Sequence, residues 1–179
     1  TKKFGQKTSL LEKTPFLLSF FIPVVIMIGI FIQRKIFPFG DNSFLRTDMY
    51  HQYAPFMNEF MEKLKHGGSL AYSWNIGMGS NFTALYAYYL ASPANWLAFL
   101  VPQSLVIEFM TYMIVLKIGL AGLSFCFYLS RHFKTKDPGI SFFAIFYALS
   151  GYMAAYSWNI MWLDCLILAP LVLLGLERL

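Results

Sequence analysis

Long runs of apolar residues alternate with shorter polar segments along this chain, and the longest runs match the thickness of a lipid bilayer. The clearest run covers residues 16–33 (FLLSFFIPVVIMIGIFIQ), contains no charged residue and is followed by Arg34. A bilayer core of about 30 Å needs about 20 helical residues. We therefore expect a first transmembrane helix over residues 16–33, in which neighbouring helices would compensate for Pro23.

Three further apolar runs predict three more membrane spans. They cover residues 104–130, 140–157 and 160–179. In the third span, small residues recur at spacings of three and four, which lines one helical face and lets another helix approach closely. This face comprises Ser141, Ala144, Ala148, Gly151 and Ala155. The last run reaches the end of the sequence, so we expect the chain to be the N-terminal part of a longer protein.

The positions of lysine and arginine predict which way the spans run, because cations near helix ends favour the cytoplasmic side. Eight of them fall on one side if the N-terminus is cytoplasmic: Lys2, Lys3, Lys7, Lys13, Arg131, Lys134, Lys136 and Arg178. We therefore expect a cytoplasmic basic tail over residues 1–15, a cytoplasmic loop over residues 131–139 and one long outer loop over residues 36–103.

The first half of the outer loop has the pattern of an amphipathic helix. Its apolar stripe comprises Met49, Tyr53, Phe56, Met57, Phe60, Met61 and Leu64. Its polar stripe comprises Asp48, Gln52, Glu59, Glu62 and His66. Thr47 is the expected N-cap, Gly67 the expected stop, and Pro55 should kink or restart the helix. Such a helix would lie on the membrane surface with its polar stripe facing water or a cavity.

Asp48 begins this helix and has polar neighbours at helical spacing. His51 and Gln52 follow it by three and four residues, so the three side chains would share one face, and Asp41 lies upstream. This arrangement suggests a ligand site, and a divalent cation is one candidate ligand. The alternative is that an aspartate in a first helical turn is favoured by the helix dipole and has no other role.

The second half of the loop is rich in aromatic and amide side chains. Gly77 and Gly79 predict a tight turn; they do not form a dinucleotide-binding motif, because no strand precedes them and the third glycine is missing. Residues 82–101 are apolar but are interrupted at Ser92 and Pro93, which favours two short interfacial helices. Candidate sugar contacts are Trp74, Asn75, Asn81 and Asn95. A membrane interface selects the same residue types.

A six-residue sequence, AYSWNI, occurs at residues 71–76 and again at residues 155–160. Both copies fall at the expected outer face, where tryptophan and tyrosine are enriched. A single match of this length does not establish a duplicated unit.

The composition supports a membrane protein. Hydrophobic residues make up 58% of the chain and charged residues only 13%, and the mean hydropathy is +0.55, so disorder and an ordinary soluble enzyme are both disfavoured. The net charge of +5 is explained by membrane topology, and nucleic-acid binding is not expected. Cys126 and Cys165 lie inside predicted spans and build no disulfide framework or zinc signature.

Three ionisable residues within the spans are candidates for function, because charge inside a bilayer is costly. Glu108 and Asp164 lie in the outer parts of their spans, where water can reach them, and Lys117 lies near the middle of its span. Lys117 either pairs with a carboxylate on another helix or reaches toward a lipid phosphate.

The order and spacing of the loop motifs resemble the YfhO family of bacterial membrane proteins. The matching pieces are R-x-D-x-x-x-Q-Y-x-P-F at residues 46–56, then Gly67 and Trp74, then G-x-G-x-N at residues 77–81 and Y-x-x-S-P-x-N at residues 89–95. The resemblance covers nearly the whole chain, although family members are several times longer.

The resemblance implies an all-α integral membrane protein whose N-terminal helices and long helical outer loop are similar to those of GT-C glycosyltransferases. Such enzymes take a sugar from a polyprenyl-phosphate donor at the outer face, and YfhO-like proteins are linked to cell-envelope polymers such as teichoic acids. The expected location is the bacterial cell membrane. Asp48 matches the functional carboxylate of the first outer loop, and the 179-residue piece alone is expected to be inactive.

The remaining roles follow from the same expectation. Asp41, His51 and Gln52 would orient the acceptor or a metal, and Arg46 or Lys117 would bind the lipid phosphate. The alternatives are a transporter or flippase of lipid-linked sugars and a membrane scaffold without chemistry.

Overall fold

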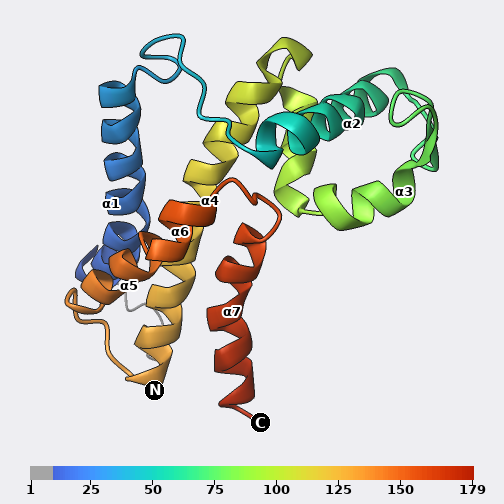
Figure 1. Ribbon diagram of the computed structural model, residues 1–179. Coiled ribbons are helices and arrows are strands. Elements are labelled where there is room, and N and C mark those ends of the chain that lie inside the picture. Colours follow the sequence, from blue (N-terminus) through green and yellow to red (C-terminus); the bar gives the residue numbers. More distant parts are fainter. Residues whose placement is uncertain (1–9) are drawn as a thin grey trace.

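A computed structural model describes residues 10–179, which are mostly helical (Figure 1). The apolar helices are α1 (Leu10–Arg34), α4 (Val106–His132), α5 (Ile140–Ala148), α6 (Gly151–Tyr156) and α7 (Leu163–Leu176). Two helices are long and apolar enough to cross a membrane, over Glu12–Arg34 and Gln103–His132. They coincide with the first two spans predicted from the sequence. Lys2, Lys3 and Lys7, which helped to predict the orientation, lie outside the described residues.

Helix α4 is the centre of the bundle. Helices α1, α5 and α7 all pack against it, and it is apolar around most of its circumference, as a helix surrounded by other helices must be. Its small residues allow the closest approaches. A Cβ atom at Gly122 would overlap the main-chain oxygen of Ser19 on α1 and would touch Ala148 on α5. The α1–α4 contact therefore depends on glycine at position 122.

Replacement of Gly122 by alanine is expected to lower the apparent melting temperature of the protein in detergent. The added methyl group must push α1 away from α4, and overpacking of this kind costs about 1–3 kcal/mol. Gly29→Ala is the matched control, because nothing lies within 4 Å of a Cβ atom at that helical position. Equal melting temperatures for the two variants would contradict this account of the packing.

The predicted third span is divided into two helices. Helix α5 ends at Ala148, the backbone of Ser150 is extended (φ −61°, ψ 161°), and α6 starts at Gly151. The predicted face of small residues therefore ends early: Ser141, Ala144 and Ala148 are buried, whereas Gly151 and Ala155 are exposed. The spacing of small residues continues across Ser150 and Gly151, but the helix is interrupted there, as is common at Gly/Ser pairs.

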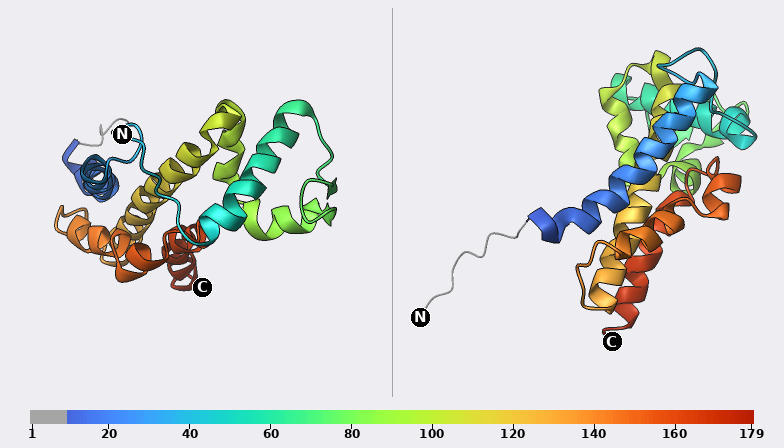
Figure 2. Two further views of the ribbon diagram at one scale, coloured as in Figure 1. Left: turned by 45° about the horizontal axis from the view of Figure 1, so that its top comes forward. Right: turned by 90° about the vertical axis from the view of Figure 1, so that its left-hand side faces the viewer.

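The outer loop folds into a lobe of short elements that lies on the opposite side of α4 from α1 (Figures 1 and 2). Its helices are the π-helical turn η1 (Met49–Tyr53), α2 (Ala54–His66), α3 (Phe82–Leu85), the π-helical turn η2 (Tyr86–Leu90), and the 3-10 helices η3 (Pro93–Leu100) and η4 (Gln103–Leu105). A two-stranded antiparallel hairpin, β1 (Tyr72–Ser73) and β2 (Ser80–Asn81), pairs Tyr72 with Asn81. The break expected at Ser92 and Pro93 is present between η2 and η3.

The amphipathic pattern correctly predicts the buried side of η1 and α2. The buried apolar side chains are Met49, Tyr53, Met57, Phe60 and Met61. Pro55 lies in the first turn of α2, where it restarts the helix, and Gly67 ends it with φ +75°. The predicted N-cap was wrong: Thr47 has φ +49°, its hydroxyl donates to the carbonyl of Arg46, and Asp48 occupies the N-cap position.

Candidate functional site around Asp48

Asp48 lies where the chain, having left α1, reaches the outer lobe. It is half-buried at the N-cap position of η1, but its side chain makes no capping hydrogen bond to the turn. Asp48 therefore does not stabilise the turn through a capping hydrogen bond, while the alternative that the helix dipole favours an aspartate here needs no such bond and is not decided by this geometry. Asp48 lies close enough to the buried Tyr53 to raise the pKa of its hydroxyl group.

The side chains around Asp48 come from three separate parts of the sequence. Tyr53 is buried, its ring contacts Tyr89 of η2 at 5.4 Å, and its hydroxyl donates to Asn159 Oδ1 at 3.4 Å. The Tyr89 hydroxyl donates to Gln52 Oε1 at 3.2 Å. Burial raises the pKa of Tyr53, and the nearby Tyr89 and Asp48 raise it further. Tyr53 therefore stays protonated and acts as a hydrogen-bond donor at neutral pH.

The predicted convergence of Asp48, His51 and Gln52 is not evident as direct contact. Gln52 is engaged by Tyr89, whereas His51 is exposed and packs against the ring of Tyr50. Within residues 10–179, no group of three or more His, Cys, Asp or Glu side chains is arranged to hold a metal ion. A divalent cation at Asp48 stays a prediction.

A groove of about 850 Å³ lies next to this site. Its apolar walls come from α1, α4 and the α5–α6 break: Ile26, Met27, Ile30, Ile118, Leu149 and Met153. Its other lining residues include Arg34 at the end of α1 and Arg46, two residues before Asp48. Arg46 Nη2 donates to the carbonyls of Ala154 and Ala155 at 2.9 and 3.2 Å. This clamp fixes the segment that carries Asp48 onto α6.

Lys117 is 1% exposed and pairs with Asp164 of α7, with Nζ 3.0 Å from Oδ2. The same Nζ donates to the carbonyl of Ile160 at 3.0 Å. Of the two alternatives for this lysine, the structure therefore contains the interhelical ion pair. Since its ammonium group is enclosed and engaged, we keep only Arg46 as the candidate ligand of a lipid phosphate.

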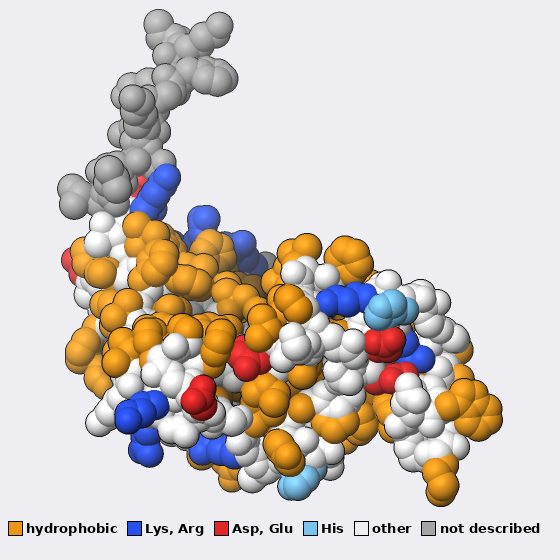
Figure 3. Space-filling view, turned by 90° about the horizontal axis from the view of Figure 1, so that it is seen from above, with side chains coloured by type: hydrophobic (Ala, Val, Ile, Leu, Met, Phe, Trp, Pro, Cys, Tyr) orange, Lys and Arg blue, Asp and Glu red, His pale blue; other side chains and the backbone are white. Residues whose placement is uncertain are grey.

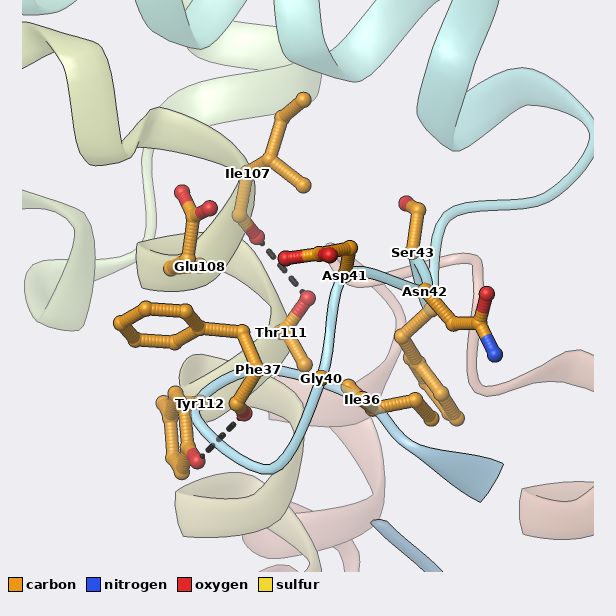
Figure 4. A pocket seen from close by; sticks show the side chains of 11 residues that line it. Ile36, Phe37, Gly40, Asp41, Asn42, Ser43, Ile107, Glu108, Thr111 and Tyr112 are labelled. Carbon is orange, nitrogen blue, oxygen red and sulfur yellow. Dashed lines mark hydrogen bonds between the residues drawn. The ribbon is translucent and has the colours of Figure 1, made fainter.

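Asp41 lies in a different pocket, of about 210 Å³, with Glu108 at the start of α4 (Figure 4). The Oε2 atom of Glu108 is buried and has no hydrogen-bond partner in the part of the chain that is described. Thr111, whose hydroxyl donates to the carbonyl of Ile107, lines the same pocket. Asp41 is therefore not part of the tyrosine cluster around Asp48.

The four candidate sugar contacts do not gather beside Asp48. Trp74 is 76% exposed in the hairpin, at the other end of the lobe from Asp48 (Figure 1). Asn75 binds Glu59, Asn81 caps α3 by accepting from the Ala84 amide, and Asn95 is buried against the carbonyl of Leu90. The three asparagine side chains therefore have structural partners in the lobe.

Glu59, in the stripe predicted to face water or a cavity, is buried (7% exposed). Its carboxylate accepts from Ser73 Oγ at 2.5 Å and Asn75 Nδ2 at 2.9 Å, and Lys63 Nζ lies 3.2 Å away. These contacts bind the hairpin to α2. Burial by itself would raise the pKa of Glu59, but the hydrogen bonds from Ser73, Asn75 and Lys63 outweigh it, so the pKa is lowered.

This network predicts a pH-dependent stability. Because the folded pKa of Glu59 is lowered, its stabilising effect is present above its ordinary value of 4.5 and is lost as the pH falls below that value. We expect the difference in melting temperature between the wild type and Glu59→Gln to be constant near neutral pH and to shrink below about pH 4.5. A difference independent of pH down to about pH 3 would contradict the assignment.

The sequence pattern missed the roles of Tyr53, Tyr89 and Asn159. The helical pattern predicts Tyr53 only as part of the apolar stripe, without a hydrogen-bonding role. Tyr53 and Tyr89 both lie in the motifs that resemble the YfhO family, but those motifs do not show that the two side chains meet. For Asn159 the signal was the second AYSWNI copy, since Asn159 lies in it as Asn75 lies in the first, and each asparagine binds a side chain from the η1–α2 segment.

The arrangement of helices and the character of their surface define a helical membrane protein. Seen from above, the outer end shows hydrophobic side chains together with uncharged polar surface and scattered charged side chains (Figure 3). Large apolar side chains are exposed on α1, α5 and α7, among them Phe21, Val25, Phe142, Phe146 and Val172. Water-facing helices do not present such surfaces, whereas lipid-facing helices do.

A family model described as "Bacterial membrane protein YfhO" matches residues 19–179. The chain therefore belongs to the YfhO family of bacterial membrane proteins. No curated protein and no solved structure matches it. The cytoplasmic position of the N-terminus stays a prediction.

Proposed function

We propose that this protein is a membrane glycosyltransferase of the GT-C type. It would transfer a sugar from a polyprenyl-phosphate donor to a cell-envelope polymer, such as a teichoic acid, at the outer face. The observation that carries the proposal is the position of Asp48. Its carboxylate is half-buried, makes no capping hydrogen bond, and lies two residues from an arginine that lines an apolar groove.

The groove has the chemistry that a lipid-linked sugar needs. Its apolar walls would take the first isoprene units, and Arg34 and Arg46 would bind the phosphate, for which the planar guanidinium group is well suited. The phosphate would then lie near Asp48, because the carbonyls of Ala154 and Ala155 hold Arg46 in place.

The reaction would use Asp48 as a general base. The acceptor hydroxyl oxygen attacks the anomeric carbon, the bond from that carbon to the donor phosphate oxygen breaks, and the phosphate leaves with the electron pair. Asp48 takes the hydroxyl proton as the sugar passes through an oxocarbenium-like state. Because the Asp48 carboxylate accepts no hydrogen bond from the backbone amides at the start of η1, it is free to accept this proton.

Other residues would orient the reactants. The amide nitrogen of Gln52 would donate to a sugar hydroxyl, since the amide oxygen already accepts from Tyr89. The buried Tyr53, whose hydroxyl donates to Asn159, would position Tyr89 through their ring contact. His51 and Asp41, which are exposed, would contact the acceptor before it reaches Asp48. Trp74 is exposed in the hairpin and not beside Asp48, so we propose that it contacts a more distant part of the polymer.

The test is transfer of radiolabel from a polyprenyl-phosphate sugar to polymer by membranes that contain the full protein. Label that depends on the protein and appears in polymer supports the enzyme. Label that changes side of the membrane but stays on the lipid supports a transporter or flippase. If neither occurs, the protein is a scaffold and the proposal is wrong.

A further inference from the structure

A second hollow, of about 620 Å³, lies at the opposite end of the bundle from Asp48. It is formed by the start of α1, the end of α4 with the turn that follows it, and the end of α7. Five cations line it: Lys13, Arg131, Lys134, Lys136 and Arg178. Glu12 is the one carboxylate among its lining residues, and Phe16 and Phe127 supply an apolar part of the wall.

An ion pair between two of its lining residues holds the hollow together, and most of the lining cations have no carboxylate partner among the described residues. Lys136 Nζ pairs with Glu12 Oε2 at 2.8 Å, which joins the turn after α4 to α1. Arg131 lies over the ring of Phe127 at 5.2 Å. For Lys13, Lys134 and Arg178, no carboxylate partner exists in the described part of the chain. Glu177, next to Arg178, is bound by Tyr128 and His132 at 2.7 and 2.9 Å.

The turn that carries Lys134 is held in one conformation. Ser130 Oγ donates to the carbonyl of Thr135 at 2.7 Å, and the Thr135 amide donates to the carbonyl of Ser130 at 3.2 Å. Lys134 itself has φ +52°, a conformation that a lysine adopts only where its surroundings require it. The lysine is thereby placed at the rim of the hollow.

We propose that this hollow binds the phosphate of an anionic phospholipid headgroup. If these cations served only to orient the protein in the membrane, they could lie scattered over the cytoplasmic side. Instead, cations from the ends of three helices line one hollow. Basic pockets between membrane helices are suited to anionic headgroups. A free phosphate ion shares the charge, but a lipid would also contact Phe16 and Phe127 in the wall of the hollow. The site is independent of the glycosyltransferase proposal.

The experiment measures lipid retained by the full protein in native mass spectrometry, with phosphatidylglycerol or phosphatidylcholine added to detergent micelles. We expect preferential retention of phosphatidylglycerol. Lys134→Gln should weaken it about fivefold and Lys134→Gln with Arg178→Gln about 25-fold, since each cation near a membrane surface contributes about that factor. Lys35→Gln is the matched control, because Lys35 is also an exposed lysine with positive φ (+54°) but lies at the other end of α1.

Three outcomes would overturn the proposal. Equal retention of the two lipids excludes a specific anionic site. Equal losses in Lys134→Gln and Lys35→Gln show that only the total charge matters. Displacement of phosphatidylglycerol by equimolar glycerol phosphate assigns the hollow to a soluble phosphate. If the double variant fails to fold, as judged by its melting temperature in phosphatidylcholine, the single variant decides.

Discussion

Asp48→Asn in the full protein is expected to reduce sugar transfer by about 10²- to 10⁴-fold, the usual contribution of a general base. Asparagine keeps the shape of the side chain but cannot accept the acceptor proton. The fold should be unaffected, because Asp48 makes no capping hydrogen bond whose loss would destabilise η1. The rate of label transfer from a polyprenyl-phosphate sugar, measured at saturating donor, gives the effect directly.

Glu62→Gln is the matched control. Glu62 is a carboxylate of the same outer helix, pairs with His66 at 2.9 Å near the far end of α2 and lies outside the groove. It should transfer sugar at the wild-type rate. Normal transfer by Asp48→Asn would remove Asp48 from the mechanism, and a matching loss in Glu62→Gln would show that any charge change in the lobe disturbs activity.

The second large effect is expected at the Lys117–Asp164 pair, and it should be asymmetric. Removal of one partner of a buried ion pair costs about 3–5 kcal/mol, because the other charge remains without compensation. Lys117 has a side chain only 2% exposed, whereas that of Asp164 is 27% exposed. Asp164→Asn therefore strands an enclosed ammonium group and should destabilise more than Lys117→Met, which leaves a carboxylate that water can reach.

The measurement is the apparent melting temperature of each variant in detergent. Loss of the exposed Glu62–His66 pair in Glu62→Gln should change stability by less than about 1 kcal/mol and serves as the reference. In the double variant Lys117→Met with Asp164→Asn, part of the loss should be recovered, because no isolated charge remains. Equal melting temperatures for the two single variants would mean that the burial of the remaining charge does not determine how much stability is lost.

Local patterns were sufficient for most of the helices. The uncharged run at residues 16–33 and the run at residues 104–130 correspond to α1 and α4, because the length of an apolar helix is set by the bilayer that it must cross. The break at Pro93 was equally visible, since proline cannot continue a helix. The interruption between α5 and α6 was not visible, because no residue there forbids a helix.

The candidate site was predictable only in part. Asp48 and Arg46 stood out through motif order, and both lie at or beside the groove. The partners Tyr89 and Asn159 are 41 and 111 residues from Asp48 along the chain. No spacing rule links residues so far apart, so their convergence depends on how the lobe packs against α6 and α7.

The two AYSWNI copies show that the local sequence does not by itself determine secondary structure here. At residues 71–76 the sequence forms the first strand of a hairpin, and at residues 155–160 it forms the end of α6 and a turn. Identical residues have identical intrinsic preferences, so the difference comes from their surroundings: Glu59 binds the first copy, and Tyr53 binds the second.

The sequence by itself determined the two long apolar helices, the buried side of the outer helix and the position of Asp48 after the first of those helices, because these follow from periodicity and from the cost of placing polar groups in lipid. Only the tertiary structure decided that Lys117 pairs with Asp164, that Glu59 is buried and that Tyr53, Tyr89 and Asn159 meet beside Asp48. Those contacts join residues distant in the chain, and their energies depend on burial and distance, which only the packed helices define.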